Sequence, residues 1–402
     1  MNQIIFHIDV NSAYLSWTAL QRLSEGAATD LRLIPSIIGG DMEKRHGVVL
    51  AKSVPAKAYG IVTGEPVVNA FRKCPNLIMD SPDHEMYERR SHTLMEFLRN
   101  ICPDIEQTSV DECYMDYTPI AGFYDSPEAA AHSIKDEVHA RFGFTVNVGI
   151  SDRKVLAKMA SDFKKPNLVH TLYSHEIADK LWPLPVSSLF MCGRSSVESL
   201  RKLGILTIGD LAAADSNIIH SHLKSHGVLL QKFARGLDDS PVISEPVKHK
   251  GVGNSITLAK DVTDRAQACR VLLSLAESVG SRLRTSHETA ALICTEIKYS
   301  NFRSVSHQTV LPAPTASNDT IYQTAVALFD ELWGLGPIRL LGIRASKLQP
   351  EDEPMQLSLF DLDMTQSSEK QQKLDAALDA IRSRYGSDAV MRGSLLRSPS
   401  EK

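Results

Sequence analysis

The sequence predicts an α+β protein of several domains, because of its length, its alternation of strand and helix patterns and two breaks in that alternation. Its 402 residues are enough for about two to four domains. Hydrophobic residues make up 43% of the chain and charged residues 23%, which is typical of globular proteins and excludes wholesale disorder. No segment has the uncharged apolar length of a membrane-spanning helix, so we expect no contact with a membrane.

Cysteine usage and charge narrow the class further. The six cysteines are far apart and none forms a Cys-x-x-Cys motif, which disfavours a zinc ribbon or a disulfide scaffold and is typical of a reducing compartment. The N-terminus lacks the basic and apolar segments of a signal peptide, so we expect a cytoplasmic protein. The net charge is −4, and only residues 242–350 are basic on balance, with 12 basic and 9 acidic residues. Charge alone therefore does not predict binding to nucleic acid.

The first 150 residues alternate in an order that suits a ferredoxin-like sheet, a split β-α-β arrangement with helices on one face. Short apolar runs bounded by turns predict strands, and apolar residues at helical spacing predict helices. The expected strands are residues 4–10, 34–40, 47–51, 105–110 and 145–150, and the expected helices are residues 12–23, 84–101 and 127–142.

Two breaks divide the rest of the chain. Pro183 and Pro185 mark the first, and residues 240–250 form the second. The segment between them is predicted to be helical, and strands and helices alternate after the second break up to about residue 347. Residues 349–354 predict an exposed connector. A helix is expected from Glu369 to Tyr385, with these sequence signals for its cap, apolar face and end: Ser368, Gln371, Leu374, Leu378, Ile381, Tyr385 and Gly386.

Three carboxylates stand at strand ends in the first part of the chain. Asp9 comes at the end of the first strand, and Asp111 and Glu112 follow the strand that begins at Ile105. Clustered carboxylates are costly unless cations neutralise them. Two Mg²⁺ ions, which prefer oxygen ligands and substrate phosphates, would do so and would promote an in-line displacement at phosphorus. The alternative is that these acids cap helices or lie solvated in turns.

The motifs around these carboxylates resemble those of the Y-family, or translesion, DNA polymerases, in particular the bacterial polymerase IV-like enzymes. The similarity runs in order along the chain from about residue 4 to residue 350. It is carried by residues 6–14, 39–40, 47–51, 56–61, 64–66, 108–116, 147–151, 154–167 and 192–211.

The resemblance implies a right-hand polymerase with a ferredoxin-like palm, small fingers, a helical thumb and an α/β little finger. The palm would comprise residues 1–18 and 77–166, the fingers 19–76, the helix-hairpin-helix-like thumb 167–240, the little finger 241–349 and a tail 350–402. The implied activity is template-directed, low-fidelity DNA synthesis from dNTPs on a primer–template, without proofreading, by a monomer. Two rivals are a non-catalytic DNA- or clamp-binding relative and another palm-type nucleotidyl enzyme, such as a cyclase.

The resemblance also assigns roles to single residues. Asp9, Asp111 and Glu112 would be catalytic and, with the Val10 carbonyl, would hold the two Mg²⁺ ions. Tyr14 would be the steric gate, an aromatic ring that leaves no room for a 2′-hydroxyl. The nucleotide-binding residues would be Asn11, Ser12, Ala13, Lys57 and Lys165.

Three positions depart from the pattern of many family members. Lys57 replaces an arginine and has no bidentate fork for phosphate. Val54 replaces a tyrosine that would donate to the triphosphate, and Asn11 replaces an aspartate. None of these changes removes a predicted metal ligand, so they concern nucleotide affinity rather than the type of reaction.

Two regions beyond the palm carry implied partner sites. Basic residues of the little finger would track the DNA backbone, namely Lys248, Lys250, Lys260, Arg282, Arg284, Lys298, Arg303 and Arg344. The tail segment Gln356, Leu357, Ser358, Leu359 and Phe360 resembles the peptide that docks bacterial polymerases on the sliding clamp. An extended segment with two apolar anchors suits a groove with an apolar pocket.

Overall fold

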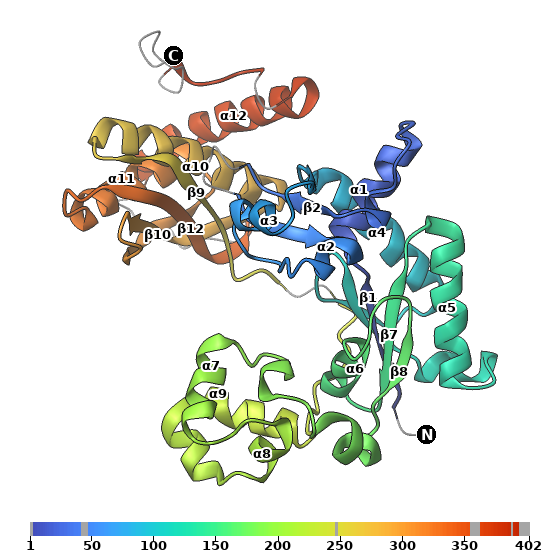
Figure 1. The fold of residues 1–402 in the computed structure, drawn as a ribbon. Helices are drawn as coiled ribbons and strands as arrows, with labels where there is room; N and C mark the ends of the chain where they lie inside the picture. The colour runs from blue at the N-terminus through green and yellow to red at the C-terminus, as the bar shows by residue number, and fades with distance from the viewer. Residues whose placement is uncertain (1–2, 42–46, 246–247, 354–361, 387–388, 394–402) are drawn as a thin grey trace. The chain divides into compact units, whose positions relative to one another are not determined.

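The structure, a computed structural model, describes residues 3–41, 47–245, 248–353, 362–386 and 389–393 (Figure 1). It divides into two compact units, the first made of residues 1–40 and 47–246 and the second of residues 41–46 and 247–402. The predicted clamp peptide, residues 356–360, lies outside the described residues.

A five-stranded sheet with the order β5-β6-β1-β7-β8 forms the centre of the first unit. Its strands are β1 (Ile5–Val10), β5 (Ile105–Gln107), β6 (Glu112–Asp116), β7 (Val146–Ser151) and β8 (Val169–Thr171). The central strand β1 runs antiparallel to β6 and β7, which places Asp9 opposite both Glu112 and Asn147. Strand β8 falls in the range predicted for the thumb, yet it pairs in parallel with β7 in this sheet.

The alternation of side chains along β1 separates an apolar face from a polar one. Phe6, Ile8 and Val10 pack in the main core with α1 (Ala13–Ser24), α4 (His84–Ile101) and α5 (Pro127–Phe142). His7 and Asp9 belong to the opposite face, against which the short helix α6 (Lys154–Ser161) packs. The sequence predicted helices on one face alone, so α6 corrects that expectation.

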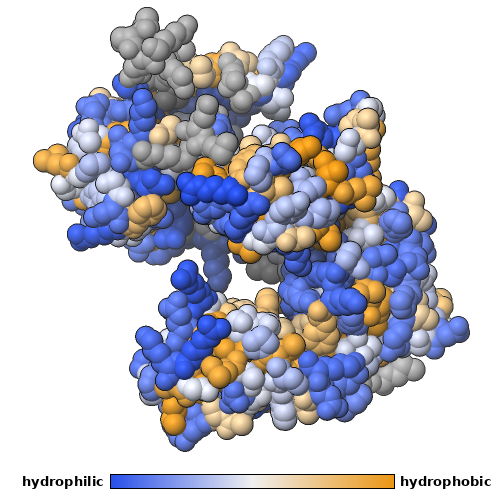
Figure 2. Space-filling model, in the orientation of Figure 1, coloured by the Kyte–Doolittle hydropathy of each residue, from blue (hydrophilic) through white to orange (hydrophobic). Residues whose placement is uncertain are grey.

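A three-stranded sheet with the order β3-β2-β4 forms most of the region predicted as fingers, and its strand β4 comes from the range predicted for the palm. Its elements are β2 (Ser36–Gly39), β3 (Val49–Lys52), β4 (Ile78–Asp80), α2 (Val54–Ala58) and α3 (Val67–Lys73). Their core is small and contains Ile37, Val49, Ile61 and Val67. Several valines of this region remain exposed, and Figure 2 shows hydrophobic residues among hydrophilic ones on the visible surface.

The region between the two predicted breaks is helical, as its sequence indicates. Helices α7 (Arg194–Lys202), α8 (Ile208–Ala213) and α9 (Ser216–Ala234) enclose a core of their own with α6 and the turn before α7. Short helical turns complete the first unit: η1 (Leu31–Leu33), η2 (Thr118–Phe123), η3 (Ser174–Glu176), η4 (Ile177–Leu181) and η5 (Val186–Ser188).

The second unit is a four-stranded antiparallel sheet with the order β11-β10-β12-β9 and helices on one face. Its elements are β9 (Gly251–Val262), α10 (Arg265–Thr285), β10 (Glu288–Tyr299), β11 (Ser304–Thr315), α11 (Asn318–Leu332), β12 (Ile338–Pro350) and α12 (Leu362–Tyr385). Helix α12 begins earlier than the predicted Glu369 and ends at the predicted residue. Its packing is also unexpected, because Asp375 is fully buried whereas the apolar Leu374 and Tyr385 are 50% and 67% exposed.

Candidate active site

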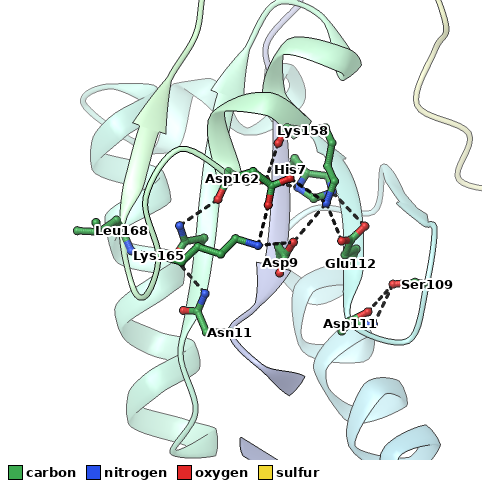
Figure 3. A network of polar contacts seen from close by, with 12 residues as sticks. His7, Asp9, Asn11, Ser109, Asp111, Glu112, Lys158, Asp162, Lys165 and Leu168 are labelled. Atoms are coloured by element: carbon green, nitrogen blue, oxygen red, sulfur yellow. Dashed lines mark hydrogen bonds and ion pairs between the residues drawn. The ribbon is translucent and has the colours of Figure 1, made fainter. Parts of the chain in front are cut away.

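Two of the three predicted catalytic carboxylates lie together on the polar face of the five-stranded sheet. Asp9 and Glu112 are register partners on β1 and β6, and one ammonium group joins their side chains. Lys158 Nζ lies 3.3 Å from Asp9 Oδ2 and 2.6 Å from Glu112 Oε1, and a weaker contact of 3.6 Å reaches Asp162 (Figure 3). Lys165 Nζ donates to Asp9 Oδ2 at 2.9 Å from the other side.

The backbone of the third carboxylate residue, Asp111, lies next to β1, but its side chain points away from Asp9 and Glu112. Its carbonyl accepts a hydrogen bond from the Val10 N–H at 3.0 Å, whereas its Oδ1 accepts from Ser109 Oγ at 2.6 Å. Among the described residues, no group of three or more His, Cys, Asp and Glu side chains converges as a metal site. The structure therefore brings Asp9 and Glu112 together, and Asp111 lies beside them without joining them.

Burial and the two lysines set the protonation of this cluster. Burial raises the pKa of Asp9 to about 6, although Lys165 and Lys158 oppose the shift. Burial also acts to raise the pKa of Glu112, but the adjacent His7 and Lys158 outweigh it and hold that pKa well below its usual range. Burial acts to lower the pKa of Lys158, and the carboxylates around it raise it instead. The cluster thus favours a cation between Asp9 and Glu112.

The donor chemistry of this point fits a divalent metal ion. Oxygen atoms of Asp9 and Glu112 already enclose one cation, the Lys158 ammonium, at contact distance. Carboxylate oxygens and a backbone carbonyl are the ligands that hard ions such as Mg²⁺ prefer. The oxygen atoms of Asp9 and Glu112 would therefore fit a hard divalent ion.

Asn11, a predicted nucleotide-binding residue, makes several hydrogen bonds within the protein. Its Nδ2 donates to Asn147 Oδ1 at 3.1 Å, and its Oδ1 accepts from Thr145 Oγ1 at 2.9 Å and from the Asn167 N–H at 2.8 Å. Its own N–H donates to the Thr145 carbonyl at 2.9 Å and is not available to an anion. The physical reason is burial, since Asn11 is only 8% exposed and its polar atoms must be satisfied internally.

The same amide pair fixes the loop that carries Lys165. Asn147 Nδ2 donates to the carbonyls of Ser161 and Lys164, and its Oδ1 accepts from the Leu168 N–H at 3.2 Å. Asn11 and Asn147 thereby connect β1 and β7 to residues 164–168. This connection places the Lys165 ammonium beside Asp9.

Ser12 and Ala13 stand at the start of α1, directly after Asp9 and Val10. Ser12 is exposed and has a left-handed backbone with φ of 49°, which is uncommon for a residue other than glycine and is often found at functional sites. No side chain caps the first turn of α1. Its N–H groups point out of the helix end and suit an anion.

Tyr14 has a ring held in place by aromatic neighbours. It stacks on Tyr87 with centroids 4.4 Å apart and planes 7° apart, and His84 meets it edge-on at 6.1 Å. Tyr87 OH is hydrogen bonded to Thr18 Oγ1 at 2.8 Å, so the supporting ring is fixed as well. The stacked ring of Tyr87 thus holds the Tyr14 ring in one orientation, and a steric gate needs such rigidity.

Lys57 is an exposed residue of α2 and lies outside the hydrogen-bonded cluster of Figure 3. Sequence reasoning gave no role to Lys158, Asn147 or Tyr87, which the structure places in contact with predicted site residues. Lys158 had a signal: it stands among apolar residues of α6, where a lysine has to find a buried partner. Asn147 and Tyr87 gave no such signal.

The second unit carries the basic residues predicted to line DNA, and the structure separates them. Leu341, Ile343 and Ala345 of β12 and Ile297 of β10 face the helices, so Arg344 and Lys298 belong to the uncovered face of the sheet. A depression of about 380 Å³ on this face is lined in part by Arg344 and Cys294.

Arg282 and Arg284 are in α10, on the covered face, which corrects their predicted position. The Arg282 guanidinium donates to the Gly253 carbonyl at 2.9 Å. Arg284 donates to Asp379 of α12 at 2.6 Å and is only 12% exposed in its side chain. Both arginines belong to a helix that packs on the covered face, so neither is on the open side of the sheet.

Comparison with known proteins agrees with this arrangement. The model of the impB/mucB/samB family matches residues 8–162, and the model of that family's C-terminal domain matches residues 249–359. The chain is 44% identical to DNA polymerase IV of Clostridium acetobutylicum over 98% of this chain and 99% of that protein. It is 34% identical to DNA polymerase IV 1 of Bacillus subtilis over 100% of this chain and 95% of that protein.

A solved structure extends the comparison to the fold. A Y-family DNA polymerase chimera superposes with a TM-score of 0.74 over 86% of this chain and 99% of its own, at 22% identity. No helix among the described residues is long and apolar enough to cross a membrane. The whole-length similarity to named polymerases shows that the chain belongs to the Y-family, or translesion, DNA polymerases, in the DNA polymerase IV group.

Proposed function

We propose that this DNA polymerase joins a dNTP to a primer 3′-hydroxyl with two Mg²⁺ ions held by Asp9, Asp111, Glu112 and the Val10 carbonyl. The observation that carries the proposal is the pair Asp9–Glu112, whose oxygens both contact one ammonium cation, that of Lys158. When bound, divalent ions would activate the attacking hydroxyl and stabilise the leaving pyrophosphate. Asp111 would join them after its side chain leaves Ser109.

The chain's other residues position the nucleotide. Lys165, fixed next to Asp9 by the Asn11–Asn147 pair, offsets the charge of the triphosphate. The N–H groups of Ser12 and Ala13 bind a phosphate oxygen at the start of α1, and Lys57 reaches the triphosphate from the fingers. Tyr14 lies under the sugar and excludes a 2′-hydroxyl. The short fingers enclose the nascent base pair loosely, which lowers fidelity and permits damaged templates.

Primer extension tests the catalytic assignment. Asp111→Ala and Asp9→Asn are each expected to abolish incorporation and to leave primer–template affinity within about threefold, because the grip on DNA is mainly electrostatic and comes from other residues. Binding is measured by fluorescence anisotropy at one salt concentration. Undiminished extension by either variant would contradict the assignment.

The proposals for DNA binding, clamp docking, oligomeric state and location rest on residues outside the active site. The uncovered face of the β11-β10-β12-β9 sheet, with Lys298 and Arg344, would track the DNA backbone. Residues 356–360 would dock on a sliding clamp, a proposal that rests on their sequence. We further propose a cytoplasmic monomer. All six cysteines are buried and free, which is in keeping with a reducing compartment.

A further inference from the structure

Lys158 occupies the point where two of the predicted metal ligands, Asp9 and Glu112, meet. Its residue exposure is 8% and that of Asp9 is 6%, whereas the Glu112 side chain is 28% exposed, so the three-way contact is partly shielded from solvent. The contact distances of 3.3 and 2.6 Å place one ammonium between two carboxylates that belong to neighbouring strands. A buried carboxylate and a partly buried one that contact the same ammonium group are stabilised by the cation between them.

The fold brings Lys158 to this point by a close approach of α6 to the sheet. A Cβ added to Gly149 of β7 would lie 2.0 Å from the Ala157 carbonyl oxygen and 2.4 Å from the Ser161 nitrogen, so only glycine allows this spacing. Ser161 Oγ donates to the Lys158 carbonyl at 2.8 Å and contacts His7 Nδ1 at 2.8 Å. The backbone of Lys158 is thus fixed to β1, while its long side chain retains rotatable bonds.

We propose that Lys158 is an internal counter-ion that holds the Asp9–Glu112 pair in the metal-free enzyme and leaves it when a divalent ion binds. A metal ion and the ammonium would compete for the same oxygen atoms. The exposed carboxylate of Asp162, 3.6 Å from Nζ, offers the displaced ammonium a partner. Lys158 is therefore a positioning residue that sets how readily metal loads, and this rests on the proposed function of the carboxylates.

The chain offers a matched control one helical turn away. Lys154 is also in α6 and equally buried, and its Nζ donates to Glu106 at 2.8 and 2.6 Å and to the Pro241 carbonyl at 3.1 Å. Glu106 is not a predicted metal ligand. Lys154→Met thus removes a buried ion pair from the same helix without touching the metal site.

The experiment measures Mn²⁺ binding to the free protein by electron paramagnetic resonance, without nucleotide or DNA. Lys158→Met is expected to bind Mn²⁺ about tenfold more tightly than the unmodified chain, because removing the competing charge leaves the carboxylates to the metal. Its melting temperature should fall in chelator and recover when Mn²⁺ is added. Lys154→Met should also melt earlier, with unchanged Mn²⁺ affinity and no such recovery.

The counter-ion role would be overturned if Lys158→Met bound Mn²⁺ no more tightly than the unmodified chain. The metal site itself would still be supported if the unmodified chain bound Mn²⁺ and Asp9→Asn did not. Binding that does not depend on Asp9 would overturn the proposed metal site itself. If Lys158→Met does not fold, the lysine Nζ resonances of the unmodified chain decide. Mg²⁺ should shift the Lys158 signal and leave that of Lys154 in place, and an unmoved Lys158 signal would refute the proposal.

Discussion

Tyr14 owes its position to one stacked neighbour, Tyr87, and this contact makes a prediction about sugar selection. Tyr87→Leu removes the ring 4.4 Å from Tyr14 and should let the gate tilt, so ribonucleotide incorporation should rise about tenfold or more relative to dNTP incorporation. Tyr87→Phe keeps the stack and should keep selectivity. The ratio of kcat/KM values for dNTP and rNTP is the measurement, with Tyr14→Ala as the fully open reference. Equal ratios in Tyr87→Leu and the unmodified chain would mean that Tyr14 needs no support.

Asp9 should make the stability of the metal-free protein depend on pH. Burial raises its pKa to about 6 from an ordinary value of 3.8. Between pH 3.8 and about pH 6, the folded state therefore keeps a proton on Asp9 that the unfolded state has released. The stabilisation due to Asp9 is then fully present below 3.8 and is lost as the pH rises through about 6. Glu112, with a lowered pKa, acts in the opposite direction and loses its stabilisation as the pH falls.

Urea unfolding in chelator isolates the contribution of Asp9. The free energy of unfolding of the unmodified chain, relative to Asp9→Asn, should decrease from about pH 4 to about pH 7 and then level off. Glu112 is present in both proteins, so its contribution largely cancels. A difference that stays constant over this range would show that the folded state does not raise the pKa of Asp9.

Helix α6 depends on a single glycine of the strand beneath it. Gly149→Ala would place a Cβ against two backbone atoms of α6, so the helix has to shift. We expect the free energy of unfolding to decrease by about 1–3 kcal/mol, the usual cost of overpacking. Gly122→Ala is the control, because nothing lies within 4 Å of its added Cβ. Equal stability of the two variants would contradict the packing.

The described side chains of helix α12 include charged groups that attach it to its unit. Asp375 accepts from the Asn318 N–H at 3.0 Å, Asp379 pairs with Arg284 at 2.6 Å, and Arg382 pairs with Glu277 at 2.9 Å. Asp375→Ala leaves buried donors unpaired, which costs about 1–3 kcal/mol. Hydrogen exchange should therefore speed up across residues 371–385 and stay unchanged in β10. Unchanged exchange in α12 would show that its attachment does not depend on this carboxylate.

Elements with strong local sequence patterns could be predicted, whereas features that depend on contacts between residues far apart in the sequence could not. The expected bounds of 84–101 and 127–142 are those of α4 and α5, because capping residues and apolar spacing define both helices locally. The exposed apolar stripe of α12 could not be foreseen, since the buried partners of Asp375 and Asp379 come from elsewhere in the chain. The same holds for Lys158 and Asn147, whose partners are far away in sequence. The sequence placed Glu112 after a strand over residues 105–110, whereas β5 ends at Gln107 and Glu112 begins β6, whose antiparallel pairing with β1 brings it opposite Asp9.

Docking on a sliding clamp would tether the whole enzyme to the primer–template without changing its active site. Leu359→Ala combined with Phe360→Ala removes two apolar anchors worth roughly 1.5–3 kcal/mol each, so clamp affinity should fall about a hundredfold or more. Single-nucleotide incorporation without clamp should not change, whereas the gain in product length with a loaded clamp should vanish. The same gain in the double variant and the unmodified chain would make another surface responsible for docking.

The central claim, that Asp9 and Glu112 form the catalytic metal site, is tested most directly by single-turnover incorporation in two carboxylate variants. Glu112→Gln removes a charge from the site, whereas Glu106→Gln removes one from the ion pair with Lys154. We expect Glu112→Gln to lose about a thousandfold or more in rate at saturating Mg²⁺, a typical cost of losing charge stabilisation in a transition state. Glu106→Gln should stay close to the unmodified rate. Comparable rates for all three proteins would contradict the account.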